Sequence, residues 1–146
     1  MTSKPDPTAL RAEAKRLMDN QMLDEAVAIL EKLGGDPESD YLRAGLLLVL
    51  NRPAEAEVLY RKVLLAAPGH LDTMVGLAGA LVAQKRAAEA LPLLEPAVRA
   101  QPQSGRIAYL AGIALDEAGH GAASAAQLAK ARAQVIAPAE RRKLVP

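Results

Sequence analysis

The fold is decided by two stretches that align at an offset of 34 residues: Pro53-Ala54-Glu55-Ala56-Glu57-Val58-Leu59-Tyr60 and Ala87-Ala88-Glu89-Ala90-Leu91-Pro92-Leu93-Leu94. The same offset relates Pro68 to Pro102 downstream and Leu47 to Leu81 and Leu115 upstream. A similar stretch at residues 23–30 precedes the first by only 30 residues. Self-similarity at such a period is typical of proteins built from stacked repeats.

Each repeat contains two segments in which apolar residues recur every three or four positions, separated by a short break. This spacing predicts a pair of helices per repeat. We place the repeats at 7–36, 37–70, 71–104 and 105–138 in a single domain over 1–146, with a basic tail at 139–146. The first repeat is shortened at Gly34-Gly35-Asp36-Pro37. Eight helices are predicted, near 8–20, 23–34, 38–51, 54–67, 71–84, 88–100, 105–118 and 122–136.

The composition fits tightly packed helices. Of the 146 residues, 51% are hydrophobic but only 2% are aromatic, so the core must consist mainly of Ala, Leu and Val. Small residues let two helices approach closely. We therefore expect Ala44 with Ala56, and Ala78 with Ala90, to be the contact points within hairpins. The fold class is all-α.

No catalytic or cofactor motif is present in the sequence, and we predict a protein without catalysis, cofactor or metal. The chain has no Cys, which excludes disulfides, thiolate metal sites and cysteine nucleophiles. His70 and His120 fall in predicted turns and are interpreted as solvated side chains. The adjacent carboxylates of Asp116 and Glu117 point about 100° apart on a helix and do not converge as an acid–base pair.

Charge and hydropathy limit the kinds of partner. The net charge of +1 argues against a dedicated nucleic-acid binder. Residues 141–143 are basic but lack aromatic neighbours, so a solvated tail is favoured over a contact with nucleic acid or an acidic partner. The sequence has neither a secretory signal nor the run of about 18 apolar residues that a membrane span requires. We expect a cytoplasmic protein.

Pro92 and Pro96 lie inside the helix predicted at 88–100. An interior proline removes a hydrogen bond. We interpret the pair as a late helix start with a kink on the outer face, and a functional bend is the alternative.

The repeat resembles the tetratricopeptide repeat, a helix–turn–helix unit of 34 residues with small residues at positions eight and twenty and proline at position thirty-two. Counted from residues 37, 71 and 105, position eight holds Ala44, Ala78 and Gly112. Position twenty holds Ala56, Ala90 and Ser124, and position thirty-two holds Pro68, Pro102 and Ile136. The family's large aromatic residue at position four is absent. The resemblance implies an α-solenoid of stacked antiparallel hairpins, wound as a right-handed superhelix.

The resemblance also implies a binding groove, because first helices line the concave face in this family. The family's groove positions carry over to a set that is apolar in the middle and charged at its ends: Arg11, Lys15, Met18, Tyr41, Gly45, Leu48, Val49, Val75, Gly79, Val82, Arg106, Tyr109, Ile113 and Asp116. The alternative is that Leu48, Val49, Val75 and Val82 only pack against neighbouring helices. The family's clamp for chaperone C-termini is not reproduced, because no Asn follows Arg11 and Lys15.

We therefore predict an interaction scaffold that binds a protein or peptide with apolar side chains. Arg11 and Lys15 would orient this partner at one end of the groove, and Asp116 and Glu117 at the other. One alternative is the N-terminal interaction module of a larger bacterial enzyme, of the sulfotransferase or hydroxylase type, suggested by the ending Lys143-Leu144-Val145-Pro146. Others are a self-associating assembly protein, suggested by the apolar run at 46–50, and a secretion-type chaperone.

Overall fold

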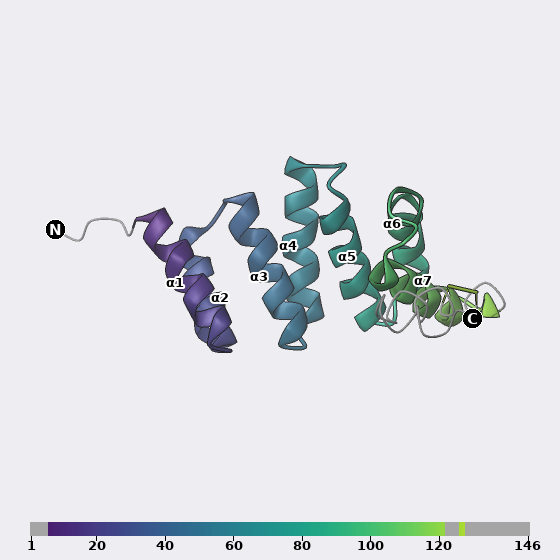
Figure 1. Cartoon of the computed structure of the whole chain (residues 1–146), viewed down its shortest axis with the longest axis horizontal. Coiled ribbons are helices and arrows are strands. Elements are labelled where there is room, and N and C mark those ends of the chain that lie inside the picture. Colours follow the sequence, from purple (N-terminus) through teal and green to yellow (C-terminus); the bar gives the residue numbers. More distant parts are fainter. Residues whose placement is uncertain (1–5, 122–125, 128–146) are drawn as a thin grey trace, which may run out of the picture. The chain divides into compact units, whose positions relative to one another are not determined.

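The computed structural model describes residues 6–121 and 126–127, and every regular element in this part of the chain is an α-helix (Figure 1). The elements are α1 (Pro7–Asp19), α2 (Leu23–Leu33), α3 (Pro37–Val49), α4 (Pro53–Ala66), α5 (Leu71–Ala83), α6 (Ala87–Ala100) and α7 (Gly105–Glu117). Each begins and ends within two residues of its predicted bounds. The eighth predicted helix (122–136), the end of the fourth repeat and the basic tail lie outside the described residues, apart from the helical residues 126–127.

The chain divides into two compact units, residues 1–80 and 81–146, with the boundary inside α5. In the first unit α1 packs against α2, α2 against α3, and α3 against α4, so that successive hairpins stand side by side (Figure 1). In the second unit α6 packs against α7. The prediction of an all-α fold built from stacked hairpins is confirmed. No helix in the described part of the chain is both long enough and apolar enough to cross a membrane.

Three first helices begin at the caps that the sequence supplies. The Asp6 carboxylate accepts a hydrogen bond from the Thr8 amide (3.1 Å) and precedes Pro7, and Asp36 accepts one from the Glu38 amide (3.3 Å) and precedes Pro37. Ser104 caps α7 through the Ile107 amide (3.3 Å). A side-chain acceptor at this position satisfies an amide that has no partner within the helix, which fixes where the helix starts.

The turn inside each hairpin has one recurring conformation. Gln21, Asn51, Lys85 and Gly119 all have positive φ, between 60° and 89°. The next residue in each case donates its amide to a carbonyl five residues back, from Met22 to Leu17, Arg52 to Leu47, Arg86 to Leu81 and His120 to Leu115, at 2.8 to 2.9 Å. This is a standard way to end a helix, because it pairs carbonyls of the last turn.

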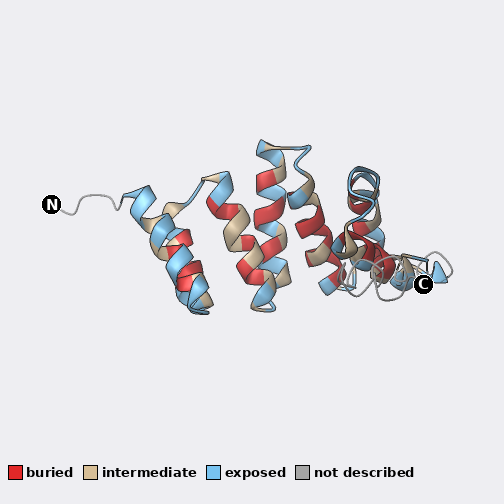
Figure 2. Cartoon of the chain, viewed as in Figure 1, coloured by how far each residue is buried: buried red, intermediate tan, exposed pale blue. Residues whose placement is uncertain are grey.

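Small residues are among the most completely buried residues of the core. Ala44, Ala56, Ala78 and Ala90 are fully buried, as predicted for the helix contact points. Figure 2 shows buried residues along one side of each helix and exposed residues along the other. Asp40, only 3% exposed, pairs with Lys62 (Oδ2 to Nζ, 3.4 Å) and so ties α3 to α4. A buried carboxylate needs such a partner.

The prolines of α6 are accommodated differently from our interpretation. The helix starts at Ala87, so a late start is wrong, and it continues through Pro92 and Pro96 to Ala100. Both prolines are exposed, which agrees with a position on the outer face. There the missing amide hydrogen bonds face water rather than the core.

Candidate partner-binding surface

The predicted groove residues are divided between the two units, and each set is described separately. The first unit contains Arg11, Lys15 and Met18 on α1, Tyr41, Gly45, Leu48 and Val49 on α3, and Val75 and Gly79 on α5. The second unit contains Val82 at the end of α5 and Arg106, Tyr109, Ile113 and Asp116 on α7.

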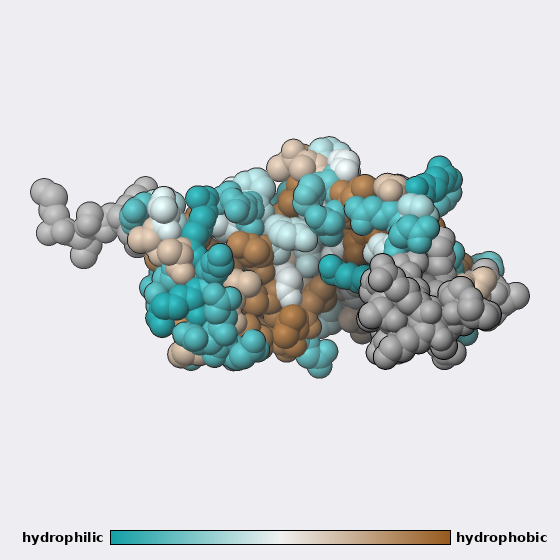
Figure 3. Space-filling model, in the orientation of Figure 1, coloured by the Kyte–Doolittle hydropathy of each residue, from teal (hydrophilic) through white to brown (hydrophobic). Residues whose placement is uncertain are grey.

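The residues Tyr41, Gly45, Leu48 and Val49, here named the α3 strip, follow one another at helical spacing on α3. Val49 is 70% exposed, and the other three are half-buried. Residues three, four and seven apart share one face of a helix. Figure 3 shows hydrophobic surface over the C-terminal half of α3, the half that holds Leu48 and Val49. The strip is therefore an accessible apolar face within the first unit.

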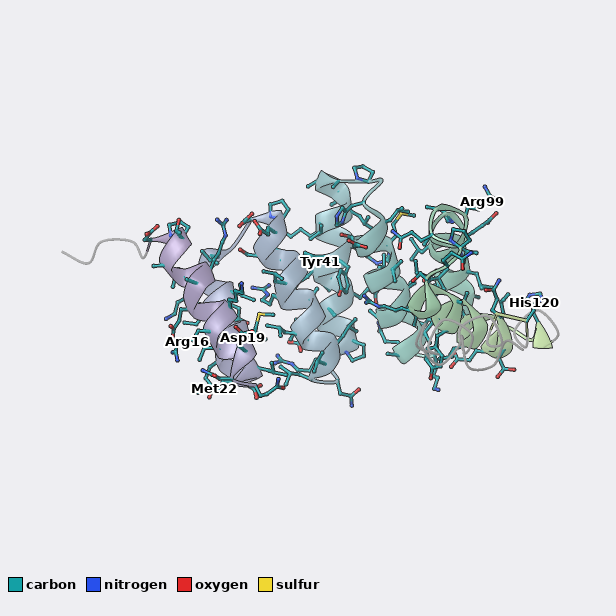
Figure 4. The ribbon with its side chains drawn as sticks, viewed as in Figure 1. Arg16, Asp19, Met22, Tyr41, Arg99 and His120 are labelled. Atoms are coloured by element: carbon teal, nitrogen blue, oxygen red, sulfur yellow. The ribbon has the colours of Figure 1, made fainter. Side chains whose placement is uncertain are left out.

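Aromatic contacts hold the Tyr41 end of the strip. The Tyr41 ring meets the ring of Tyr60 on α4 edge to face, with centroids 6.0 Å apart, and the imidazole of His70 at 5.8 Å. His70 Nδ1 is hydrogen-bonded to the buried Thr73 hydroxyl (2.6 Å). Figure 4 shows Tyr41 projecting from α3 toward the side on which α4 and α5 lie. These contacts restrict the ring, which lowers the entropy cost of using it in recognition.

The sequence analysis interpreted His70 as a solvated side chain and placed neither His70 nor Tyr60 in the candidate site. His70 is exposed in a turn, as predicted, but its ring also contacts Tyr41 and Thr73. Thr73 follows His70 by three residues, which is the spacing at which a residue before a helix bonds to the first turn.

Three glycines of the first unit meet very different surroundings. A Cβ at Gly76 would lie 2.5 Å from Cζ of Tyr60, so the absence of a side chain there makes room for the tyrosine. A Cβ at Gly45 would lie 3.8 Å from the Tyr60 hydroxyl, and one at Gly79 would lie 3.9 Å from Cδ1 of Leu48. Those are ordinary contact distances. Gly45 and Gly79 are therefore not required by packing inside the chain.

The charges near the strip differ from the predicted arrangement. Arg11 forms an ion pair with Asp36, the residue that caps α3. The Arg11 guanidinium lowers the pKa of Asp36 below its ordinary value, with smaller contributions from the Ser39 hydroxyl and the Glu38 amide, while Asp36 raises the pKa of Arg11. Lys15 is exposed on α1. Arg11 is thus already neutralised within the chain.

Two predicted groove residues are not accessible. Val75 and Val82 are buried, so they cannot contact a partner in this conformation, and their burial agrees with the alternative of packing against neighbouring helices. Leu48 is half-buried and Val49 exposed, so the same alternative does not hold for Val49.

In the second unit the predicted residues on α7 are largely accessible. Tyr109, Arg106 and Asp116 are exposed, and Ile113 is half-buried. The neighbouring Glu117 pairs with Lys85 (3.4 Å). On another side of α7, a cavity of about 400 Å³ is lined by Leu91, Leu94, Glu95, Val98, Arg99, Ala111, Leu115 and Gln127.

Among residues 6–121 and 126–127 no group of three or more His, Asp or Glu side chains is placed to hold a metal ion. The described surface offers features suited to recognition, namely an apolar strip, a restrained aromatic ring and two helix glycines that no packing contact within the chain requires.

Comparison with known proteins agrees with this description. A family model for the tetratricopeptide repeat matches residues 47–112. No curated protein shows significant similarity to the sequence. Among solved structures, MamA (residues 41 to the end) from Desulfovibrio magneticus RS-1 superposes with a TM-score of 0.81 at 26% identity, over 91% of this chain and 78% of that one.

Two further structures share the fold at lower identity. YrrB, described as a tetratricopeptide-repeat protein with an unusual peptide-binding site, has a TM-score of 0.74 at 23% identity over 89% of this chain and 69% of that chain. The thermophilic protein TTC0263 of Thermus thermophilus has a TM-score of 0.72 at 23% identity, over 92% of this chain and 77% of that chain.

The hairpin architecture and the repeat period define a helical repeat protein. Residues 47–112 match the tetratricopeptide repeat, as the sequence predicted, and the solved structures that share the fold include tetratricopeptide-repeat proteins. A fold of this type implies a scaffold for interactions between proteins.

Proposed function

We propose that this protein binds a peptide segment of a partner on the α3 strip and that it does so without catalysis. The observation that carries the proposal is the accessible apolar face made by Tyr41, Gly45, Leu48 and Val49. A helix in a repeat array that has neighbours to pack against does not need such residues on its open side, and an exposed aromatic–aliphatic patch is typical of binding sites. The peptide-binding site described for YrrB supports the same use of this fold.

The test compares two valines of matched exposure on different helices. Val49 on α3 is 70% exposed and Val58 on α4 is 67% exposed. We expect Val49→Glu to reduce the amount of partner captured from a lysate of the source organism by about tenfold or more, because a charge would be buried against an apolar segment. Val58→Glu, which lies outside the strip, should leave capture unchanged.

Far-ultraviolet circular dichroism of both variants controls for folding. Tyr41→Ala is the second variant, since it removes the restrained ring and leaves the charge of the surface unaltered. Equal capture by the two valine variants and by Tyr41→Ala, with the helical signal intact, would contradict the proposal.

The other hypotheses from the sequence remain predictions. Self-association is tested by static light scattering over a range of protein concentrations, where a constant monomer mass excludes it. The enzyme-module hypothesis is tested by the coding sequence beyond Pro146, where a stop codon excludes it.

A further inference from the structure

Resting on the proposed function, we infer that the partner segment is basic and apolar: an extended peptide with a Lys or Arg held between Glu38 and Asp72, followed by apolar side chains that lie along the α3 strip. The inference concerns the chemistry of the ligand, which the proposed function leaves open.

The first step is the charge of the surface. Glu38 is the second residue of α3 and Asp72 the second residue of α5, 34 residues apart and therefore equivalent in successive repeats. Both are exposed, and in the part of the chain that the structure describes neither forms an ion pair. The nearby cation Arg11 is bound by Asp36. The starting ends of α3 and α5 therefore present net negative charge.

The second step is the absence of basic groups on the rest of these two helices. α5 contains no Lys or Arg, and α3 contains only Arg43. Arg43 lines a different hollow, together with Glu31, Arg52 and Glu55. A partner with acidic groups would meet repulsion that α3 and α5 themselves do not compensate, and besides the paired Arg11, Lys15 on α1 is the exposed cation of the first unit that the predicted groove adds. A cation at the starting ends of α3 and α5 would meet the carboxylates of Glu38 and Asp72, and Tyr41, three residues after Glu38 on α3, could add cation–π attraction.

The third step is the close approach that the glycines permit. Gly45 follows Tyr41 by one helical turn, and a Cβ at Gly79 would lie 3.9 Å from Cδ1 of Leu48 on α3. Glycine inside a helix is less favourable than alanine. Alanine would fit at both places, so the chain gains nothing internally from these two glycines. The missing Cβ atoms leave room for a peptide backbone to lie against the two helices.

The fourth step is the length of the segment. Glu38 and Leu48 are ten residues apart, about 15 Å along a helix. An extended chain rises about 3.3 Å per residue. The cation and the last apolar side chain of the peptide should therefore be about four residues apart, in either chain direction.

The experiment uses fluorescein-labelled synthetic peptides containing Lys-Ser-Leu-Ser-Leu or its reverse, with matched probes that carry Gln or Glu in place of Lys. Fluorescence anisotropy against the full chain gives the affinities. We expect the Lys probe to bind about 1.5- to 5-fold more tightly than the Gln probe, the range for exposed ion pairs, and the Glu probe to bind least.

Two double variants separate a ligand contact from a structural role. Glu38→Gln with Asp72→Asn should abolish the preference for Lys over Gln and leave binding of the Gln probe unchanged. The matched control is Asp24→Asn with Glu25→Gln, which removes two exposed first-turn carboxylates from α2 and should leave the preference intact. Helix-dipole effects are common to both pairs.

The remaining outcomes distinguish failure of this inference from failure of the proposed function. Equal binding of the Lys, Gln and Glu probes, or tighter binding of the Glu probe, overturns the inference. If Val49→Glu still weakens those probes, the proposed function stands. If no probe binds, the inference fails and the proposed function depends on the capture experiment alone.

Discussion

Gly76 and Gly79, three residues apart on α5, face very different surroundings. Gly76 lies under the Tyr60 ring, which is buried and fixed against Tyr41, so the ring cannot move aside to admit a methyl group. At Gly79 the nearest atom to a Cβ is the flexible end of Leu48. The local sequence of α5 does not distinguish the two glycines. The difference lies in the residue that each one faces on another helix, which is Tyr60 for Gly76 and Leu48 for Gly79.

The two glycines therefore predict opposite effects on stability. Gly76→Ala should lower the free energy of unfolding by about 1–3 kcal/mol through overpacking, although alanine is the better helix former. Gly79→Ala should raise it by as much as about 1 kcal/mol. Urea unfolding measures both. Combining Gly76→Ala with Tyr60→Ala should remove most of the cost, and a full cost in that background would contradict the packing explanation.

Asp36 predicts a pH dependence with a defined sign. Arg11 lowers the pKa of Asp36 in the folded state. The Asp36 carboxylate therefore takes up a proton more readily in the unfolded chain than in the folded one. The stabilisation is therefore complete above the unfolded pKa of about 3.9 and is lost as pH falls through the lower folded value.

Asp36→Asn keeps a residue that can cap α3 but removes the charge. It should be less stable than the parent chain near neutral pH, and the difference should shrink as pH falls below about 3.9. Thermal unfolding from neutral to acid pH measures this, with Asp6→Asn as a control cap on α1. A difference that is independent of pH would exclude the ion pair as its cause.

At the scale of the element, the turn inside each hairpin has the same backbone conformation, although the residue type at its positive-φ position differs. Four of these turn positions in the described chain adopt positive φ, yet only Gly119 is a glycine, while Gln21, Asn51 and Lys85 bear side chains. Side chains are disfavoured in this conformation by roughly 1 kcal/mol. The hydrogen bonds that close the turn and the packing of the two helices outweigh that cost.

Glycine at these turns should therefore stabilise the chain. We expect Gln21→Gly to raise the free energy of unfolding by about 0.5–1 kcal/mol, because it removes the steric cost in a conformation that glycine adopts readily. Gly119→Ala should lower it by a similar amount. Urea unfolding of both variants is the measurement, and a destabilising Gln21→Gly would show that the Gln21 side chain makes a contact of its own.

The helices were predictable because their signals are local. Asp6-Pro7 and Asp36-Pro37 mark helix starts, and the buried alanines recur at a fixed period. The site was less predictable because accessibility depends on neighbouring helices. Val75 and Val49 are both apolar groove candidates in the sequence, yet one is buried and the other exposed. Nothing near Arg11 in the sequence shows that Asp36, 25 residues away, will neutralise it.

At the scale of the whole molecule, stability in a repeat protein is the sum of terms within repeats and between adjacent ones. The first unit follows this pattern, since α2 packs only against its sequence neighbours α1 and α3 among the described helix pairs with substantial contact. A local defect should therefore spread only to adjacent repeats.

Hydrogen exchange measured by mass spectrometry tests this expectation. Gly76→Ala should speed exchange in the amides of α3, α4 and α5 more than in those of α6 and α7, because the defect lies between Gly76 and Tyr60 in the first unit. A uniform increase over all helices of the described chain would instead show that it unfolds as one cooperative body.

The fit of Tyr60 over Gly76 also restricts how the gene can be rearranged. The hairpin that carries Tyr60 must be followed by one with glycine at the sixth position, and residues 42 and 110, which hold that place in the two flanking repeats, are both leucine. A permuted or shuffled library should therefore yield folded members mainly when the second and third hairpins are inherited together.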